Sequence, residues 1–339
     1  MSEPIRPGDQ GAPVRDLHRR LLAVGHPVDA LEVSGDHFGP DTTRALLAFQ
    51  AERGLDEHGT VDETTQAALV EAGVRLGDRH LSLPAPMFRG DDVADLQLRL
   101  GSLGFDAGRI DGIFGPDTAG ALRDFQRNTG LAVDGIAGTE TVQAFRQLLG
   151  RSAGRTPVAQ VRELDRLRQG NPDLRGQRLA IGQFGSSGAL IAALARILRA
   201  RGAHVLVLDN PDEAAQATTA NDFDAVMYLG LKIENSSHSQ ANYFATLGFQ
   251  SEGGYRLAHH CATGLDHALR SSDVPPTEAA GRQVPVLRRT RMPAVLCTLA
   301  PPSAVVLATA EIADALSTAI TRWVANPAAD PDQAATVEA

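Results

Sequence analysis

Hydrophobic positions divide the chain into two parts with different periodicities. Before residue 150, apolar residues recur every three or four positions, which is typical of helices with one buried face. In one such stretch Val93, Leu96 and Leu100 share a face, and Gly104 follows where the helix should end. After residue 177, short apolar runs alternate with helical patterns. The pattern therefore predicts an all-helical part followed by an α/β part.

An internal repeat occupies the helical part. The sequence FGPDT occurs twice, 76 residues apart, and the 32 positions from Phe38 match those from Phe114 at 14 identities without a gap. Such a repeat indicates a duplicated structural unit. Asp-Gly pairs predict tight turns, and Pro116 predicts a helix start, so each copy is expected to form three short helices. The first copy has three extra residues between Gly25 and Phe38, which we interpret as a longer loop.

The α/β part predicts a mostly parallel sheet with helices on both faces. Strands are expected at 179–184, 204–208, 225–229, 242–248 and 294–299, and helices at 190–198, 212–221, 254–269 and 305–324. The predicted fold class is thus multidomain, with two small all-α three-helix modules followed by an α/β domain. The predicted divisions are module 1 at 1–76, module 2 at 77–150, a linker with one charged helical stretch at 151–176, the α/β domain at 177–325 and a disordered tail at 326–339.

Composition excludes some classes of function. The net charge of -9 argues against a basic nucleic-acid-binding face. No apolar run approaches 18 residues, so no membrane span is predicted, and the first residues show no secretory signal, so we expect a cytoplasmic protein. Cys261 and Cys297 have no metal-ligand spacing and are expected to be reduced, buried thiols. Lys232 is the only lysine, which we interpret as codon bias.

The repeated unit resembles the peptidoglycan-binding module found on bacterial cell-wall hydrolases. The second copy carries the pattern D-G-x-F-G-P-x-T-x-x-A-L-x-x-F-Q followed by G-L-x-x-D-G-x-x-G-x-x-T. The resemblance implies binding of glycan or muropeptide, with Asp111, Phe114 and Asp134 as the candidate residues. The first copy departs from the pattern at three turn positions, which hold Gly35, His58 and Asp62.

Three later segments resemble the zinc-dependent N-acetylmuramoyl-L-alanine amidases. They are DEAAQATTANDFDAVMYLG at 212–230, VPVLRRTRMPAVLCTL at 284–299 and IADALSTAITRWV at 312–324. The resemblance implies an α/β fold in which two His and one Glu hold a zinc ion. It also implies a further Glu as general base for hydrolysis of the bond between muramic acid and the stem peptide.

The residues that this chemistry needs are missing from the expected positions. The metal ligands are expected near Gln183, Gly185 and Gly230, and the catalytic Glu at Thr298. None of these side chains is an ordinary zinc ligand, and a threonine cannot serve as a base near neutral pH. We therefore expect no cofactor, no catalytic residue and a pseudoenzyme.

The sequence also contains two weaker candidate sites. Gly182-x-x-Gly185-x-x-Gly188 lies between a strand and a helix, with Asp209 at the end of the next strand, as in a dinucleotide-binding unit, although the glycine spacing differs. His259, His260 and His267 lie on one predicted helix without enough acids or thiols nearby to complete a metal site.

The combination of two modules with an emptied amidase domain resembles the CwlM group of actinobacterial regulators. This resemblance implies a non-catalytic, cytoplasmic regulator of peptidoglycan precursor synthesis. Its expected partners are a MurA-like enzyme, a Ser/Thr kinase, and peptidoglycan fragments or lipid-linked precursor. Thr336, in the acidic tail, is the candidate phosphorylation site. The alternatives are an active zinc amidase whose site lies elsewhere and a simple peptidoglycan-binding protein.

Overall fold

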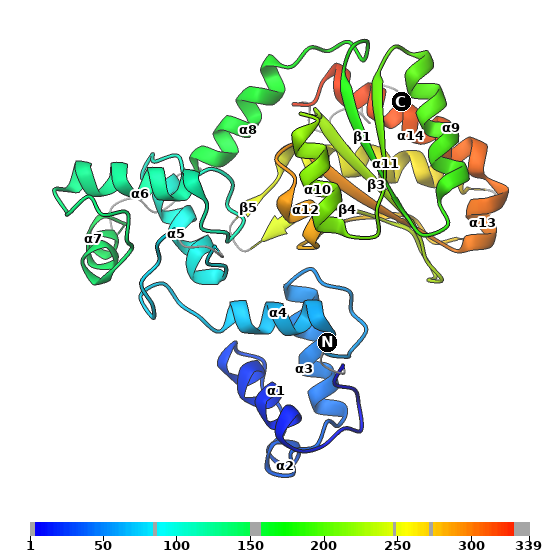
Figure 1. The fold of residues 1–339 in the computed structure, drawn as a ribbon. Helices are drawn as coiled ribbons and strands as arrows, with labels where there is room; N and C mark the ends of the chain where they lie inside the picture. The colour runs from blue at the N-terminus through cyan, green and yellow to red at the C-terminus, as the bar shows by residue number, and fades with distance from the viewer. Residues whose placement is uncertain (1–3, 84–86, 150–156, 247–248, 271–273, 329–339) are drawn as a thin grey trace. The chain divides into compact units, whose positions relative to one another are not determined.

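The computed structural model describes residues 4–83, 87–149, 157–246, 249–270 and 274–328 (Figure 1). The chain forms two compact units, Met1–Ala159 and Gln160–Ala339. The first unit is helical and contains both copies of the repeat. The second unit contains the sheet.

The first copy of the repeat folds around α1 (Ala12–Ala23), α3 (Pro40–Glu52) and α4 (Glu63–Ala72). Its core is formed by buried apolar side chains, among them Val14, Leu21, Phe38, Phe49 and Leu69. The extra residues were predicted to form a longer loop. They form instead a short additional helix, α2 (Ala30–Ser34). Asp29 begins this helix, because its carboxylate accepts a hydrogen bond of 2.8 Å from Leu31 N.

The second copy has the three predicted helices, α5 (Asp91–Ser102), α6 (Pro116–Thr129) and α7 (Thr139–Leu149). Pro116 occupies the first turn of α6, and Gly130 ends the helix in a left-handed conformation with φ 73°. The rings of Phe125 and Phe145 stack in the core between the helices, with 4.2 Å between their centroids. The all-helical fold predicted for this part of the chain is therefore confirmed.

Within its described residues, the second unit is built on one sheet of seven strands. The strands are β1 (Arg178–Phe184), β2 (His204–Asp209), β3 (Met227–Ile233), β4 (Gln240–Thr246), β5 (Phe249–Gln250), β6 (Glu278–Arg282) and β7 (Ala294–Leu299). Their order is β2-β1-β3-β7-β4-β5, with β6 paired to β4. The pairs β1–β2, β1–β3, β3–β7 and β4–β6 are parallel, whereas β4 runs antiparallel to β7 and β5. The predicted, mostly parallel sheet is thus confirmed.

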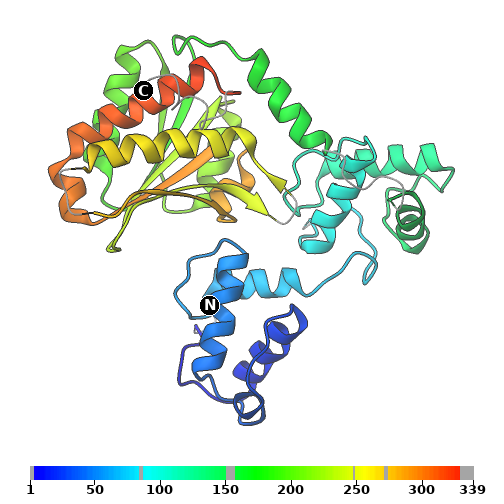
Figure 2. The ribbon, with the colours of Figure 1, turned by 180° about the vertical axis from the view of Figure 1, so that it is seen from behind.

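Helices cover both faces of this sheet (Figures 1 and 2). On one face lie α9 (Gly188–Ala200), α11 (Glu252–Ala268) and α14 (Thr309–Ala325), and their apolar residues join those of the sheet in a single core. On the other face lie α10 (Glu213–Asp222) and the short α12 (Pro285–Arg289). Cys261 and Cys297 are buried free thiols, as expected. None of the helices in the described ranges is long and apolar enough to cross a membrane.

This unit differs from the sequence prediction in several elements. The strands β5 and β6 and the helix α12 were not predicted. The sequence of β6, EAAGR, is a poor strand sequence and is held by pairing with β4. The single helix predicted at 305–324 is divided at Ala308, where φ -103° and ψ 22° separate α13 (Pro302–Leu307) from α14.

The charged helix predicted within the linker is α8 (Val158–Gln169), and it packs on the second unit. Leu167 is buried in the core of that unit. The carboxylate of Glu163 accepts hydrogen bonds from Ser251 Oγ at 2.6 Å and Gly253 N at 3.2 Å, so it stabilises the first turn of α11. Most of α8 therefore belongs structurally to the α/β unit.

Candidate functional site

The positions predicted for the amidase chemistry come together at the carboxyl edge of the sheet. Gln183 on β1 pairs in register with Leu231 on β3, one residue after Gly230. Thr298 on β7 pairs with Lys232, the residue after Leu231. Gly185 follows β1 directly, with φ 65°. The strand register therefore places Gln183, Gly230 and Thr298 within two residue steps of one another along β3.

The donor set at this edge does not fit a zinc ion. The predicted positions hold Gln183, Gly185, Gly230 and Thr298, and the neighbouring Lys232 ammonium forms an ion pair with Glu234. Among the described residues, no group of three or more His, Cys, Asp and Glu side chains could hold a metal ion. A protonated lysine repels a metal ion rather than binding it, and zinc needs His, Cys or carboxylate ligands.

Part of the space near this edge is filled by a buried polar network. The Tyr228 hydroxyl donates to Gln216 Oε1 at 2.8 Å, and Gln216 Nε2 donates to the carbonyl of Gln183 at 3.0 Å. A Cβ at Gly182 would lie 2.7 Å from Cζ of Tyr228, and one at Gly230 would lie 2.8 Å from Cδ1 of Leu296. Both glycines are thus required by packing, and burial raises the pKa of Tyr228.

Two of the three histidines of α11, His259 and His260, have a structural partner or are partly buried, whereas His267 is exposed. His259 Nδ1 contacts the Tyr255 carbonyl at 2.9 Å, which is the ordinary bond of a helical histidine to the preceding turn. Burial lowers the pKa of His260. The glycines between β1 and α9 do lie in a β-α-β unit, but packing against Tyr228 explains Gly182 without a nucleotide.

The second module uses its candidate residues within its own fold. Asp111 accepts a hydrogen bond from Gln97 Nε2 at 3.0 Å, and Asp134 accepts one from Gln126 Nε2 at 2.7 Å. Phe114 is fully buried in the module core. Hydrogen bonds from the backbone of Ile136 and from Gln126 hold the pKa of Asp134 below its ordinary value. The glycan-binding role of Asp111, Phe114 and Asp134 stays a prediction.

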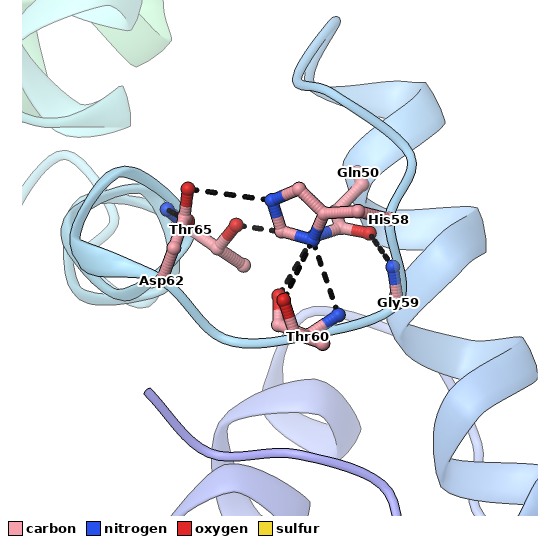
Figure 3. A network of polar contacts seen from close by, with 6 residues as sticks. All are labelled: Gln50, His58, Gly59, Thr60, Asp62 and Thr65. Atoms are coloured by element: carbon pink, nitrogen blue, oxygen red, sulfur yellow. Dashed lines mark hydrogen bonds and ion pairs between the residues drawn. The ribbon is translucent and has the colours of Figure 1, made fainter. Parts of the chain in front are cut away.

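In the first module, the turn equivalent to the one at Asp134 is held by a different set of contacts (Figure 3). His58, the equivalent of Asp134, accepts a hydrogen bond at Nδ1 from Thr60 N at 3.2 Å. Its Nε2 lies 3.3 Å from the carboxylate of Asp62, which replaces Gly138. Asp62 also begins α4, because it accepts from Thr65 N at 2.7 Å. The two departures of the first copy from the module pattern are therefore coupled to each other.

Sequence reasoning missed two features of these regions. One is the place of Lys232 at the sheet edge, for which its being the only lysine was the available signal. The other is Glu32, which lies on the unpredicted helix α2 and accepts a hydrogen bond of 2.8 Å from Thr42 N at the start of α3. No short-range pattern links these two residues, because they are ten positions apart and belong to different elements.

Comparison with known proteins gives a family match for the two repeats and similar proteins for longer parts of the chain. Residues 10–69 and 89–145 each match the model of a putative peptidoglycan binding domain. The chain is 35% identical over 327 residues to N-acetylmuramoyl-L-alanine amidase CwlM of Mycobacterium tuberculosis, covering 86% of this chain and 80% of that one. It is 30% identical over 165 residues to N-acetylmuramoyl-L-alanine amidase CwlL of Bacillus licheniformis, covering 43% and 46%.

Among solved structures, N-acetylmuramoyl-L-alanine amidase AmiC2 of Nostoc punctiforme is similar to 44% of this chain over 98% of its own length, with 14% identity and a TM-score of 0.36. The identity of 35% to CwlM, over 86% of this chain and 80% of that protein, is what assigns the family. The chain belongs to the CwlM family of N-acetylmuramoyl-L-alanine amidase homologues with peptidoglycan-binding modules.

Proposed function

We propose that this protein is a non-catalytic, amidase-like regulator of peptidoglycan precursor synthesis that acts by protein contact. One observation carries the proposal. At the carboxyl edge of the sheet, Gln183, Gly230 and Thr298 lie within two register steps of one another, and Thr298 pairs with Lys232. A metal hydrolase of this family needs metal ligands and a general base at that place.

The finer parts of the proposal come from the likeness to the CwlM group. They are a MurA-type enolpyruvyl transferase as partner, a cytoplasmic location and control by a Ser/Thr kinase. Thr336 is the proposed phosphate acceptor and lies outside the described residues. We also propose that the modules, 1–76 and 77–150, bind peptidoglycan fragments or lipid-linked precursor, and that 177–325 is the surface for the partner. In the proposed domain organisation, residues 151–176 are the linker between the modules and the α/β domain, and residues 326–339 are the tail.

The test is the rate of a MurA-type transferase from the same organism, followed by release of phosphate. Addition of the full chain should raise the rate in a saturable way, and prior treatment with a Ser/Thr kinase should change the effect unless Thr336 is replaced by Ala. An unchanged rate at a tenfold molar excess of the chain, with and without the kinase, would refute the proposal.

Two other functions each have an observation in their favour. The similarity to the N-acetylmuramoyl-L-alanine amidases CwlM and CwlL favours an active amidase, which predicts release of stem peptide from muropeptides. The two module matches favour a simple peptidoglycan-binding protein. That function predicts sedimentation with insoluble peptidoglycan and no effect on the transferase.

A further inference from the structure

A buried histidine connects three helices of the first module. His18 on α1 is 1% exposed, and its Nε2 lies 2.7 Å from the hydroxyl oxygen of Thr42 on α3. The same hydroxyl oxygen lies 2.6 Å from the carboxylate of Glu32 on α2. One threonine oxygen therefore links the imidazole ring of α1 to the carboxylate of α2.

The directions of these two hydrogen bonds fix the tautomer of His18. The Glu32 carboxylate also accepts hydrogen bonds from three backbone N–H groups. They belong to Gly39 at 3.2 Å, Asp41 at 2.9 Å and Thr42 at 2.8 Å. Burial opposes ionisation of Glu32, but its hydrogen bonds outweigh burial and hold its pKa below the ordinary value. The carboxylate is thus ionised, so the Thr42 hydroxyl donates its single proton to it and accepts from His18 Nε2. In the uncharged ring, Nδ1 then carries a lone pair and no proton.

A second proton on this ring has no acceptor. Nδ1 of His18 is buried and, within the described ranges, has no hydrogen-bond partner. Burial of an unpaired donor is costly, and the cost is larger when the donor is charged. Burial accordingly lowers the pKa of His18, although the charges of Glu32 and Asp36 oppose this effect, and repulsion by His37 adds to it. The folded module therefore disfavours the protonated ring.

The ionisable groups that act on the ring come from elements other than α1. Glu32 belongs to α2, and Asp36 and His37 belong to the segment after α2. The group that faces the ring from α3 is the uncharged hydroxyl of Thr42. Asp36 is also paired with Arg15. Among the residues that the structure describes, no ionisable side chain of α4 acts on the ring. The two carboxylates attract a charged ring, but neither offers its Nδ1 a hydrogen bond.

The second module has a glutamine in place of this histidine. Because the first module has three extra residues before Phe38, the equivalent of His18 lies 79 positions later, at Gln97. Gln97 Nε2 donates to the hydroxyl of Thr118, the equivalent of Thr42, at 3.1 Å. Its Oε1 accepts from Gly112 N at 2.8 Å. Both ends of the glutamine are satisfied, and the side chain does not titrate.

We propose that His18 is a pH-sensitive switch confined to the first module. Protonation at Nδ1, as the pH falls from about 7.5 to about 5.5, weakens the packing of α1 against α3. Through the Thr42 hydroxyl it also weakens the hold of Glu32 on the start of α3. The first module then opens more often in acid, whereas the second module, with Gln97, does not share this response.

Linkage gives the sign and the size of the effect. The pKa of His18 in the folded chain lies below its ordinary value of 6.5, so its contribution to stability is complete above that value. The contribution is lost as the pH falls toward the folded pKa. One such group changes the folding equilibrium by at most about tenfold between pH 7.5 and 5.5. Glu32 has an ordinary value of 4.5 and stays ionised over this range, so it does not produce the same response.

The first test is nitrogen NMR of the full chain labelled in its histidine rings, with His18 assigned through its backbone resonances. At about pH 7.5 the His18 ring should carry its proton on Nε2 alone, and its pKa should lie below 6.5. A proton on Nδ1 of the uncharged ring, or titration at or above 6.5, would overturn the inference.

The second test is amide hydrogen exchange of the full chain, expressed as protection relative to the unfolded chain at the same pH. Between about pH 7.5 and 5.5, protection of α1 and α3 should fall about threefold to tenfold. Protection of α5 and α6 should not fall, since α5, α6 and α7 contain no histidine.

His18→Gln places the residue of the second module in the first and keeps a donor for Thr42, so its protection should no longer fall in acid. His37→Gln is the matched control. It makes the same change at a second histidine of this module, whose Nδ1 lies 3.3 Å from Gln10 Nε2, and it should keep the response to acid. An equal fall in His18→Gln, or no fall in the unaltered chain, would contradict the proposal.

Discussion

Replacement of Tyr228 by Phe tests the polar network beneath the carboxyl edge of the sheet. The Tyr228 hydroxyl is buried and donates to Gln216 Oε1 at 2.8 Å. The substitution leaves the ring in place, so it creates no large cavity, but Gln216 Oε1 loses its donor. A buried acceptor without a partner costs about 1–3 kcal/mol. We expect the free energy of unfolding of the α/β unit to fall by about that amount.

The assay is urea unfolding of the full chain followed by the fluorescence of Trp323. This residue is the only tryptophan, is buried in the α/β unit and donates to the carbonyl of Gly253 at 3.1 Å, so its emission reports on that unit. Tyr243→Phe is the matched control. Among the described residues its hydroxyl has no recorded hydrogen bond, and the change should cost less than about 0.5 kcal/mol. The reasoning would be refuted if Tyr228→Phe lowered the free energy of unfolding by no more than the control does, with the slope of that free energy against urea concentration unchanged.

Three further predictions concern the first module and are read by hydrogen exchange of its helices. Glu32→Ala should destabilise the start of α3 by about 1–2 kcal/mol, because four hydrogen bonds are lost. An unchanged rate of amide hydrogen exchange at Thr42 would contradict this. The pKa of Glu32 in the folded chain lies below 4.5, so its stabilisation of the start of α3 is complete above that pH and is lost as the pH falls through the folded pKa. Glu32→Gln should therefore make the stability of α3 less dependent on pH. An equal loss of stability in acid for the variant and the unaltered chain would contradict this. His58→Asp should destabilise the turn because it faces Asp62, and adding Asp62→Gly should recover most of the loss; additive losses would show that the two positions are not coupled.

Much of the fold can be predicted from the sequence, because the residue patterns that determine it lie within single helices, strands and turns. The repeat, the glycine and proline positions and the spacing of apolar residues predict α5, α6 and α7 directly. Buried runs such as Leu179–Phe184 and Ala294–Leu299 predict β1 and β7, since strands covered on both faces are continuously apolar.

The parts that sequence reasoning missed depend on tertiary contacts. The strand β6 exists because its backbone pairs with β4, not because its residues favour a strand. Helix α2 was interpreted as a loop, because five residues are too few to show a helical period. Its function in holding α3 through Glu32 becomes visible only when the chain is folded.

The candidate site shows the same limit. The sequence indicated that Gln183, Gly230 and Thr298 stand where amidase chemistry would be expected, and the strand register places them together. It did not indicate that Lys232 lies beside Thr298, because which residue faces which across parallel strands is set by the register and not by either strand alone.

The proposal that the chain is not a hydrolase is tested most directly by zinc titration of the full protein, with an active N-acetylmuramoyl-L-alanine amidase as control. The calorimeter should record no saturable binding at zinc concentrations that fill the control enzyme, and muropeptides should keep their stem peptides. One zinc ion bound per chain, accompanied by release of stem peptide, would contradict the account.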